Sequence, residues 1–284
     1  MQTPSDDNNR NDDYKDSKSN FKEKKDYTHS RQNRNQRQTT SNFIFGWHPV
    51  LEALRSDKTI DKILVEKDFK SEEMTELMQL VRKQSIYVQR VPVEKLNRVT
   101  RKAHQGVVAF VSEIDFVPLE NIVAGAFEAG KNPLILILDR ITDVRNFGAI
   151  VRSAECTGVD GIVVPTRLTA QMGADAVKTS AGALMHMPIC RYRSLVGAVN
   201  FLKESGLKVV ACTEKTDKQI YDLELDMPLA IVMGSEEVGI SEEVLEVVDE
   251  RASLPMVGKV GSLNVSVATG VALYEVVRQK SITN

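Results

Sequence analysis

The chain has 284 residues, enough for two ordinary domains, because a compact domain takes about 100 to 200 residues. Hydrophobic residues make up 42% and charged residues 27%, the balance of a soluble globular protein. No apolar run approaches the roughly 20 residues that span a bilayer, and the polar N-terminus lacks the apolar core of a signal peptide. We therefore expect a cytoplasmic protein without a membrane segment. The net charge of -2 gives no overall attraction to nucleic acid, so an RNA partner would need a local basic surface.

The first 42 residues contain no Leu, Ile or Val. Such a segment has almost no apolar surface to offset the entropy of ordering it, so residues 1–42 are predicted to form a disordered polar tail. The later part of this tail is rich in Lys and Arg and could contact RNA phosphates. Its composition alone favours a solubilising role.

Helical and extended patterns alternate after the tail. The predicted helices span 48–56 and 72–84, and the predicted strands span 60–65, 86–91 and 106–111. The second helix has one apolar stripe at helical spacing, formed by Met74, Leu77, Met78 and Val81. We expect a small mixed α/β domain over 43–112, followed by a linker with a connecting helix over 113–132.

From residue 133 to the C-terminus at residue 284, strands alternate with helices. The predicted strands span 134–138, 161–164, 208–211 and 229–233, and the predicted helices span 147–156, 174–179, 195–204 and 264–279. Leu134–Leu138 is a continuous apolar run, which is typical of a strand buried on both faces. This alternation predicts a parallel sheet covered by helices on both sides.

Ligands of such sheets bind where loops leave the carboxyl ends of the strands. Three loops at these places are rich in Gly and small polar residues: Asp143–Gly148, Gly234–Ser241 and Pro255–Asn264. None of them contains GxGxxG or GxxxxGK[ST], so the usual nucleotide-binding fingerprints are absent. These patterns by themselves predict a ligand-binding α/β domain, most simply an enzyme.

The remaining chemically active residues do not indicate a metal or redox site. The three cysteines lie far apart and lack CxxC spacing, so neither a disulfide framework nor a zinc site is predicted. His48 and His104 lack the partner spacing of a metal site or a catalytic triad, and we interpret both as structural or RNA-contacting. Trp47 could stack on an RNA base, but a packed core position is at least as well supported.

Three stretches, taken together, resemble the three signature motifs of the SpoU (TrmH) family of RNA 2'-O-ribose methyltransferases in order and spacing. They are DRITDVRNFGAIVRSAECTGVDGIVVP (139–165), IVMGSEEVGIS (231–241) and LPMVGKVGSLNVSVATGVALYE (254–275). The resemblance extends to KTSAGAL (178–184). Residues 43–112 look like the RNA-substrate-binding domain of that family, through GWHPVLEAL (46–54) and HQGVVA (104–109). Taken together, the resemblance covers the whole chain after residue 42.

The resemblance implies a C-terminal α/β knot of the SPOUT class, in which the end of a parallel sheet domain threads through a loop as a deep trefoil. It further implies an S-adenosylmethionine pocket in the knot loops and a homodimer with the active site at the subunit interface. The separate N-terminal domain makes the chain most similar to the subgroup that methylates a guanosine of 23S ribosomal RNA. Two alternatives stay open: a transfer-RNA 2'-O-methyltransferase of the same family, and a noncatalytic RNA-binding ribosome assembly factor.

The resemblance also assigns site residues by their positions in the motifs. The catalytic residues that it implies are Asn146, Arg152, Glu236, Ser262 and Asn264. The cofactor-binding residues that it implies are Gly234, Leu254, Met256 and Leu263, with no metal. Because a guanidinium stays protonated in proteins, we expect Arg152 to hold an RNA phosphate and stabilise the developing oxyanion rather than to act as the base. Glu236 could orient Asn146 or Arg152, or face the cation of the cofactor.

The first motif also predicts how its helix begins. We expect Asn146 to cap a helix that starts near Phe147, and the missing side chain of Gly148 to leave space for a ligand. Many members of the family have a proline just before this region, whereas this chain has Val144 and Arg145. The turn is therefore expected to be looser, although no proposed chemical group is lost.

Overall fold

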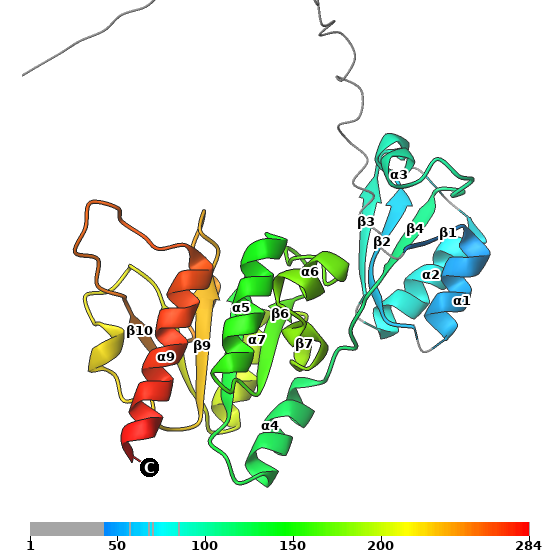
Figure 1. The fold of residues 1–284 in the computed structure, drawn as a ribbon. Coiled ribbons are helices and arrows are strands. Elements are labelled where there is room, and N and C mark those ends of the chain that lie inside the picture. The colour runs from blue at the N-terminus through cyan, green and yellow to red at the C-terminus, as the bar shows by residue number, and fades with distance from the viewer. Residues whose placement is uncertain (1–42, 57, 68, 70, 85, 284) are drawn as a thin grey trace, which may run out of the picture. The chain divides into compact units, whose positions relative to one another are not determined.

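The computed structural model describes residues 43–56, 58–67, 69, 71–84 and 86–283. The tail predicted for residues 1–42 lies outside this range. The described residues form a four-stranded mixed sheet in the N-terminal part and a six-stranded parallel sheet in the C-terminal part (Figure 1). No helix among them is long and apolar enough to cross a membrane.

The N-terminal sheet has the strand order β1-β4-β2-β3, with β1 and β2 antiparallel to β4 and β3 parallel to β2. Its elements are β1 (Phe43–Phe45), α1 (Trp47–Arg55), β2 (Ile60–Glu66), α2 (Glu72–Lys83), β3 (Tyr87–Val91), α3 (Val93–Val99) and β4 (Val107–Val111). Helices α1 and α2 share one apolar core with one face of the sheet, and α3 packs on the other face. This confirms the predicted small mixed α/β domain.

Trp47 and His104 are structural in this domain. The Trp47 indole is buried and stacks on Phe69 with ring centroids 4.9 Å apart, while its Nε1 donates to the carbonyl of Gln105 at 2.8 Å. His104 is also buried, and its Nδ1 accepts the backbone N–H of Gly106 at 3.0 Å. The indole is therefore part of the core, and base stacking by Trp47 is excluded in this conformation.

The C-terminal sheet has the order β10-β8-β9-β5-β6-β7, and every pair of neighbours is parallel. Its strands are β5 (Leu134–Asp139), β6 (Gly161–Pro165), β7 (Ile189–Tyr192), β8 (Lys208–Cys212), β9 (Leu229–Gly234) and β10 (Glu250–Ala252). Its helices are α4 (Leu119–Glu128), α5 (Val144–Cys156), α6 (Ala174–Thr179), α7 (Leu195–Glu204), α8 (Glu242–Leu245) and α9 (Val265–Thr283), with short 3-10 turns at Ala183–Met185 and Ile220–Asp222.

Both faces of this sheet are covered, as the apolar run in β5 predicts. Leu134, Leu136 and Leu138 face the core formed with α5, α6 and α9, whereas Ile135 and Ile137 face the core formed with α4, α7 and α8. All five side chains are buried. Helices α5 and α9 lie side by side on the first face (Figure 1). The predicted parallel sheet with helices on both sides is confirmed.

Five helices and strands were missed by the sequence prediction: β1, α3, β7, α8 and β10. They are short, with three, seven, four, four and three residues respectively. Such segments contain at most two turns of helix or a few alternating positions, which is too little for a periodic pattern. Their conformation depends on the neighbouring strand or core that each of them joins.

Candidate active site

The three loops predicted to hold the ligand meet at the carboxyl ends of β5 and β9 and at the start of α9. The first loop leads from β5 into α5, the second follows β9, and the third precedes α9. Strands β5 and β9 are neighbours in the sheet, with Asp139 paired to Gly234 at their ends. The parallel pairing therefore brings together residues that are about 100 positions apart in sequence.

Asp143, and not Asn146, caps helix α5. The Asp143 side chain accepts the backbone N–H groups of Arg145 at 2.9 Å and Asn146 at 2.8 Å. The helix begins at Val144, so Asn146 lies inside its first turn. The predicted cap is therefore wrong, because an aspartate three residues earlier satisfies the free N–H groups of the helix. This leaves the Asn146 amide available for the loops.

Gly148 does not leave space for a ligand, which corrects the second expectation for this helix. A Cβ atom built on Gly148 would lie 2.0 Å from Oγ1 and 2.6 Å from Cβ of Thr179, in α6. Gly148 is thus a close-packing position between α5 and α6. Its missing side chain makes room for another helix of the protein.

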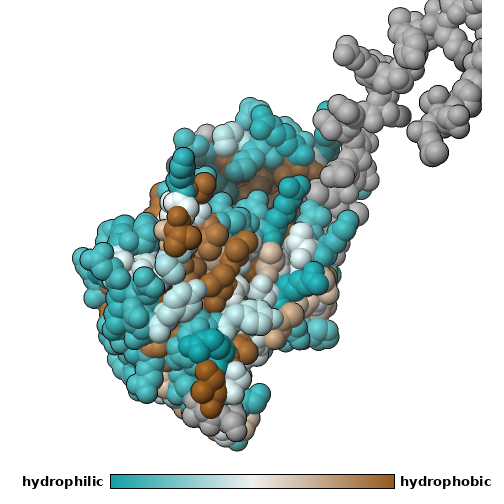
Figure 2. Space-filling view, turned by 60° about the vertical axis from the view of Figure 1, so that its left-hand side comes forward, coloured by the Kyte–Doolittle hydropathy of each residue, from teal (hydrophilic) through white to brown (hydrophobic). Residues whose placement is uncertain are grey.

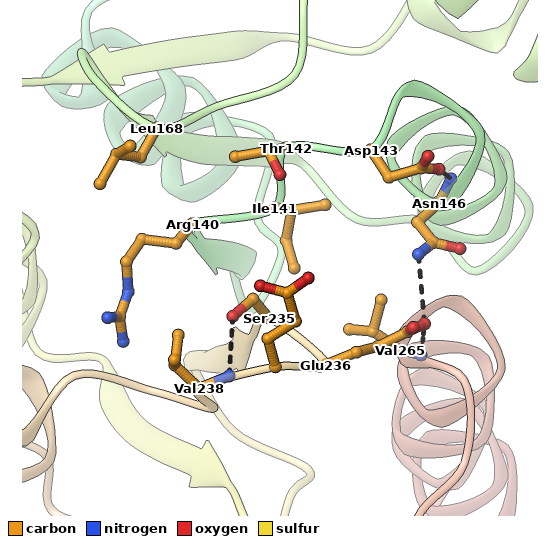
Figure 3. A pocket seen from close by; sticks show the side chains of 11 residues that line it. Arg140, Ile141, Thr142, Asp143, Asn146, Leu168, Ser235, Glu236, Val238 and Val265 are labelled. Atoms are coloured by element: carbon orange, nitrogen blue, oxygen red, sulfur yellow. Dashed lines mark hydrogen bonds between the residues drawn. The ribbon is translucent and has the colours of Figure 1, made fainter.

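Asn146, Glu236 and Asn264 form a polar cluster that joins all three loops, and Figure 3 shows the contact between Asn146 and Glu236. Asn146 Nδ2 donates to Glu236 Oε1 at 3.1 Å, and Asn264 Nδ2 donates to Asn146 Oδ1 at 3.0 Å. Asn264 Nδ2 also donates to Glu236 Oε1, and the backbone N–H of Val265 reaches the same oxygen at 3.0 Å. Glu236 therefore occupies the N-terminus of α9, where a negative charge is stabilised by the helix dipole.

Asn264 has a second task in this cluster, because it caps α9. Its Oδ1 accepts the backbone N–H of Ser266 at 3.0 Å, and its carbonyl accepts that of Ala268 at 2.9 Å. The amide oxygen is engaged by the helix, and the amide nitrogen donates to Glu236 and Asn146, so rotation of the side chain would break several hydrogen bonds. The cluster is thus a polar junction that links the three loops at this edge of the sheet.

The loop after β9 folds back tightly on the strand. A Cβ on Gly234 would lie 2.2 Å from the carbonyl carbon of Gly239, so only glycine fits at this position. The loop is closed by the backbone N–H of Gly239, which donates to the carbonyl of Ser235 at 2.9 Å. Gly234 consequently contributes backbone shape to the site.

Two cavities adjoin this loop. The larger has a volume of about 430 Å³. Its wall includes Gly234, Leu254, Met256, Ser262 and Leu263. This places all four predicted cofactor residues, and Ser262 with them, around one space of the size that small-molecule sites have. Ser262 lies in this wall and not in the polar cluster.

The smaller cavity, of about 230 Å³, lies on the other side of the loop and is lined by Arg140, Thr142, Asn146 and Leu168, among others. In Figure 3 Asn146 points toward Glu236 and the start of α9, while Arg140 and Leu168 lie at the opposite side. The loop residues 235–238 line both cavities. A group bound in one cavity is therefore separated from a group in the other only by this loop and the polar cluster.

The chemistry of the larger cavity fits S-adenosylmethionine. Apolar side chains from Met233, Ile240 and Leu254 offer surface for an adenine ring, and the carboxylates of Glu214 and Glu237 offer negative charge for a sulfonium or ammonium. Sequence reasoning missed the contribution of residues 212–214 at the end of β8, because no motif follows that strand. Burial raises the pKa of the Cys212 thiol there to about 11, so the thiol itself is neutral at pH 7.

Arg152 lies apart from the other predicted catalytic residues. It is exposed on α5 and lines neither cavity, and among the described residues it has no hydrogen-bond or ion-pair partner. It lies six positions after Asn146 on the same helix, which corresponds to a rise of about 9 Å and a rotation of about 240°. The structure of one chain therefore brings together Asn146, Glu236 and Asn264, but not Arg152.

The fold and the site define a class: a parallel α/β domain with a cofactor-sized cavity in the loops after its central strands, preceded by a small mixed-sheet domain. Family comparisons agree with this class. Residues 133–274 match the SpoU rRNA Methylase family, and residues 43–117 match the family described as RNA 2'-O ribose methyltransferase substrate binding. The chain belongs to the SpoU (TrmH) family of RNA methyltransferases.

Curated relatives support the same assignment over almost their whole length. A Staphylococcus saprophyticus protein named as a TrmH family tRNA/rRNA methyltransferase is 36% identical over 238 residues, which are 84% of this chain and 96% of that protein. Bacillus subtilis YacO, which has the same family name, is 36% identical over 239 residues, again 84% of this chain and 96% of that protein.

Solved structures show the same fold. The SpoU methyltransferase AviRb from Streptomyces viridochromogenes is 25% identical, with a TM-score of 0.55 over 85% of this chain and 90% of that chain. Its complex with the cofactor AdoMet, which is S-adenosylmethionine, has a TM-score of 0.54 at 25% identity over 84% of this chain and 90% of that chain. The expected SpoU fold class and the cofactor of the family are thereby confirmed.

Proposed function

We propose that this protein transfers the methyl group of S-adenosylmethionine to a ribose 2'-hydroxyl of RNA, with a guanosine of 23S ribosomal RNA as the target. The observation that carries this proposal is the pair of adjoining cavities with the Asn146–Glu236–Asn264 cluster at their boundary. The methyl donor occupies the larger cavity and the acceptor nucleotide the smaller one. We place this activity in the cytoplasm.

The sulfonium of the cofactor makes its methyl group electrophilic, so the protein has to align the ribose oxygen and assist the loss of its proton. Asn146 is suited to alignment, because Glu236 and Asn264 fix both ends of its amide. Arg152 supplies positive charge for the adjacent phosphate and the developing oxyanion, as a permanently protonated guanidinium can. Ser262 lines the wall of the cofactor cavity and adds a hydroxyl donor or acceptor there.

The position of Arg152 supports a homodimer whose active site is shared. Since Arg152 of one chain is exposed and far from its own cluster, the guanidinium at a given cluster would come from a second copy. Hydrophobic side chains are also exposed on α9 and the loop before it: Val257, Val260, Leu263, Val267 and Tyr274. Figure 2 shows a face of the molecule on which hydrophobic side chains gather near the middle. Burying such side chains between two copies would favour association.

The two sheets belong to two domains with different proposed functions. We propose that residues 43–112 bind the RNA substrate, that residues 113–132 connect the domains, and that residues 133–284 carry the methyl transfer. The match of residues 43–117 to a substrate-binding family supports the first assignment. A separate substrate-binding domain is also the feature that favours ribosomal RNA over transfer RNA.

Incubation of the purified protein with tritiated S-adenosylmethionine and unmodified 23S ribosomal RNA tests the reaction. Label should appear on a guanosine ribose, and a 2'-deoxy nucleotide at the mapped position should abolish transfer. Label on transfer RNA alone would replace the ribosomal target with the tRNA alternative. Absence of cofactor binding in calorimetry would leave a noncatalytic RNA-binding factor.

Mixing two inactive variants tests the shared site. Arg152→Ala and Asn146→Ala should each lose transfer while retaining S-adenosylmethionine binding. After subunit exchange at equal amounts, about half of the dimers are mixed, and each has one site with both residues intact, so about one quarter of wild-type activity should return. If both residues act within one chain, no activity returns. A monomer in light scattering would also overturn the shared site.

A further inference from the structure

Arg140 has an unfavourable backbone conformation and an unusually well-placed side chain. It follows β5 directly, and its φ of +59° lies in the left-handed region that glycine adopts without cost and a residue with a side chain rarely adopts. Arg140 was not among the residues that the motifs assigned to the site. A residue held in such a conformation is often retained for what its side chain does there.

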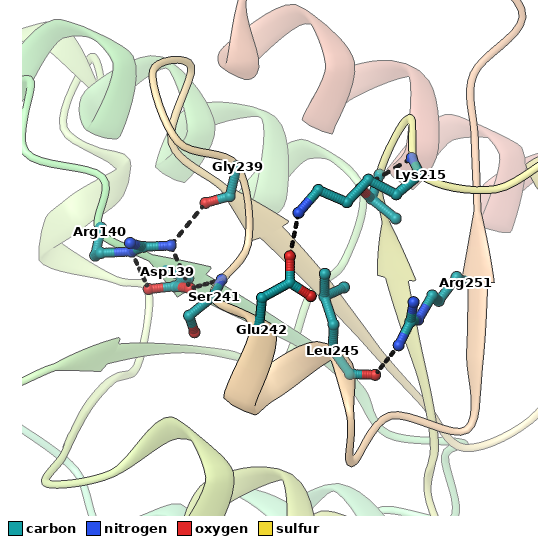
Figure 4. A network of polar contacts seen from close by, with 9 residues as sticks. Asp139, Arg140, Lys215, Gly239, Ser241, Glu242, Leu245 and Arg251 are labelled. Carbon is teal, nitrogen blue, oxygen red and sulfur yellow. Dashed lines mark hydrogen bonds and ion pairs between the residues drawn. The ribbon is translucent and has the colours of Figure 1, made fainter.

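The Arg140 side chain bridges the end of β5 and the loop after β9 (Figure 4). Its Nε donates to Asp139 Oδ1 at 3.0 Å, and one terminal nitrogen donates to the carbonyl of Gly239 at 3.1 Å. Asp139 is itself buried, and its Oδ2 accepts the backbone N–H of Ser241 at 2.7 Å. The loop is therefore held at two successive points, by the guanidinium at Gly239 and by the carboxylate at Ser241.

The loop held in this way, Ser235–Ile240, forms part of both cavities. It contains Glu236, which anchors Asn146 and Asn264, and it separates the two cavities along residues 235–238. Gly234 lies against Gly239 and Ile240, which keeps the two ends of the loop close together. The hydrogen bond from Arg140 to the Gly239 carbonyl ties the same end of the loop to β5.

We propose that Arg140 is a positioning residue, which latches the loop Ser235–Ile240 in the form that binds the methyl donor. Hydrogen bonds with an ionised partner are stronger than neutral ones, and a guanidinium presents its donors in a fixed planar fork that can reach Asp139 and Gly239 together. A lysine has a single side-chain nitrogen and cannot make the hydrogen bonds to Asp139 and Gly239 in the same geometry. This inference rests on the proposed function, since it concerns the loop of the proposed cofactor site.

The substitution Arg140→Gly separates a latch from a simple structural brace, because it removes the guanidinium and relieves the left-handed strain together. Binding is measured below the melting temperature of each protein, because Arg140→Gly relieves the strain but also leaves the buried Asp139 carboxylate without its guanidinium. The latch predicts that the Kd for S-adenosylmethionine in calorimetry rises about tenfold and that the KM for the cofactor rises in parallel. Arg140→Lys, which keeps the charge, should recover part of this loss.

Ala181→Gly is the matched control for backbone strain. Ala181 also has a positive φ, +52°, and lies outside both cavities, so its replacement should raise the melting temperature without changing the Kd for S-adenosylmethionine. An Arg140→Gly protein that binds the cofactor as tightly as the wild type would overturn the latch. So would one that melts earlier yet binds normally when folded. A wild-type protein that binds no S-adenosylmethionine would instead refute the proposed function.

Discussion

Replacing Gly148 by alanine tests how closely α5 and α6 approach. In an isolated helix this change would stabilise by about 1 kcal/mol, because glycine is a poor helix former. Here the new Cβ would lie 2.0 Å from Oγ1 and 2.6 Å from Cβ of Thr179, and 3.0 Å from the backbone nitrogen of Ser180. The hydroxyl can rotate away, but Cβ and the backbone nitrogen move only if the helices separate.

Such overpacking costs about 1 to 3 kcal/mol, and the displacement required here lies toward the upper end, so it exceeds the gain in helix propensity. We therefore expect the free energy of unfolding of Gly148→Ala, measured with urea and circular dichroism, to fall by about 1 to 2 kcal/mol. In a Thr179→Gly background the same change should cost less, because of these contacts only that with the backbone nitrogen of Ser180 remains, and the double-mutant cycle isolates the coupling to Thr179. A Gly148→Ala protein as stable as the wild type would show that this position is not close-packed.

Three further changes have defined outcomes. Val144→Pro should raise the free energy of unfolding by about 0.4 to 1 kcal/mol, seen as a higher midpoint in urea. The reason is that Val144 is the first residue of α5, where proline fits, and the residue before it is extended. Asp61→Ala should lower the free energy of unfolding by about 3 to 5 kcal/mol, because it leaves the Arg191 guanidinium, with 7% of its side chain exposed, buried without its carboxylate. Iodoacetamide at neutral pH, followed by mass spectrometry, should label the exposed Cys156 before Cys212, whose pKa burial raises to about 11.

The parts of the fold that could be predicted are those with long patterns. The run Leu134–Leu138 indicated a strand buried on both faces, and the alternation of strands with helices indicated the parallel sheet. Short edge elements such as β7 and β10 could not be predicted, because their conformation is set by the strands beside them. The local sequence pattern is therefore enough to predict long elements, whereas short elements are determined by their pairing in the folded protein.

The site divides in a similar way. The motif positions that resemble the SpoU family identified side chains that do meet, such as Asn146 and Glu236, although they are 90 residues apart. The residue that caps α5 was not predictable from the sequence. Asp143 and Asn146 are equally good caps by residue type, and the path of the chain after β5 decides between them. The role of Gly148 depended on Thr179, a residue on another helix.

The polar cluster gives the two cavities a common wall, and this has a thermodynamic consequence. Glu236 accepts hydrogen bonds from Asn146 at the acceptor side and from the start of α9 at Val265, next to the cofactor side. If the methyl donor and the RNA occupy the two cavities as proposed, a ligand that favours one position of the Ser235–Ile240 loop alters the affinity of the other cavity. By linkage, each of the two ligands would then change the binding of the other by the same factor.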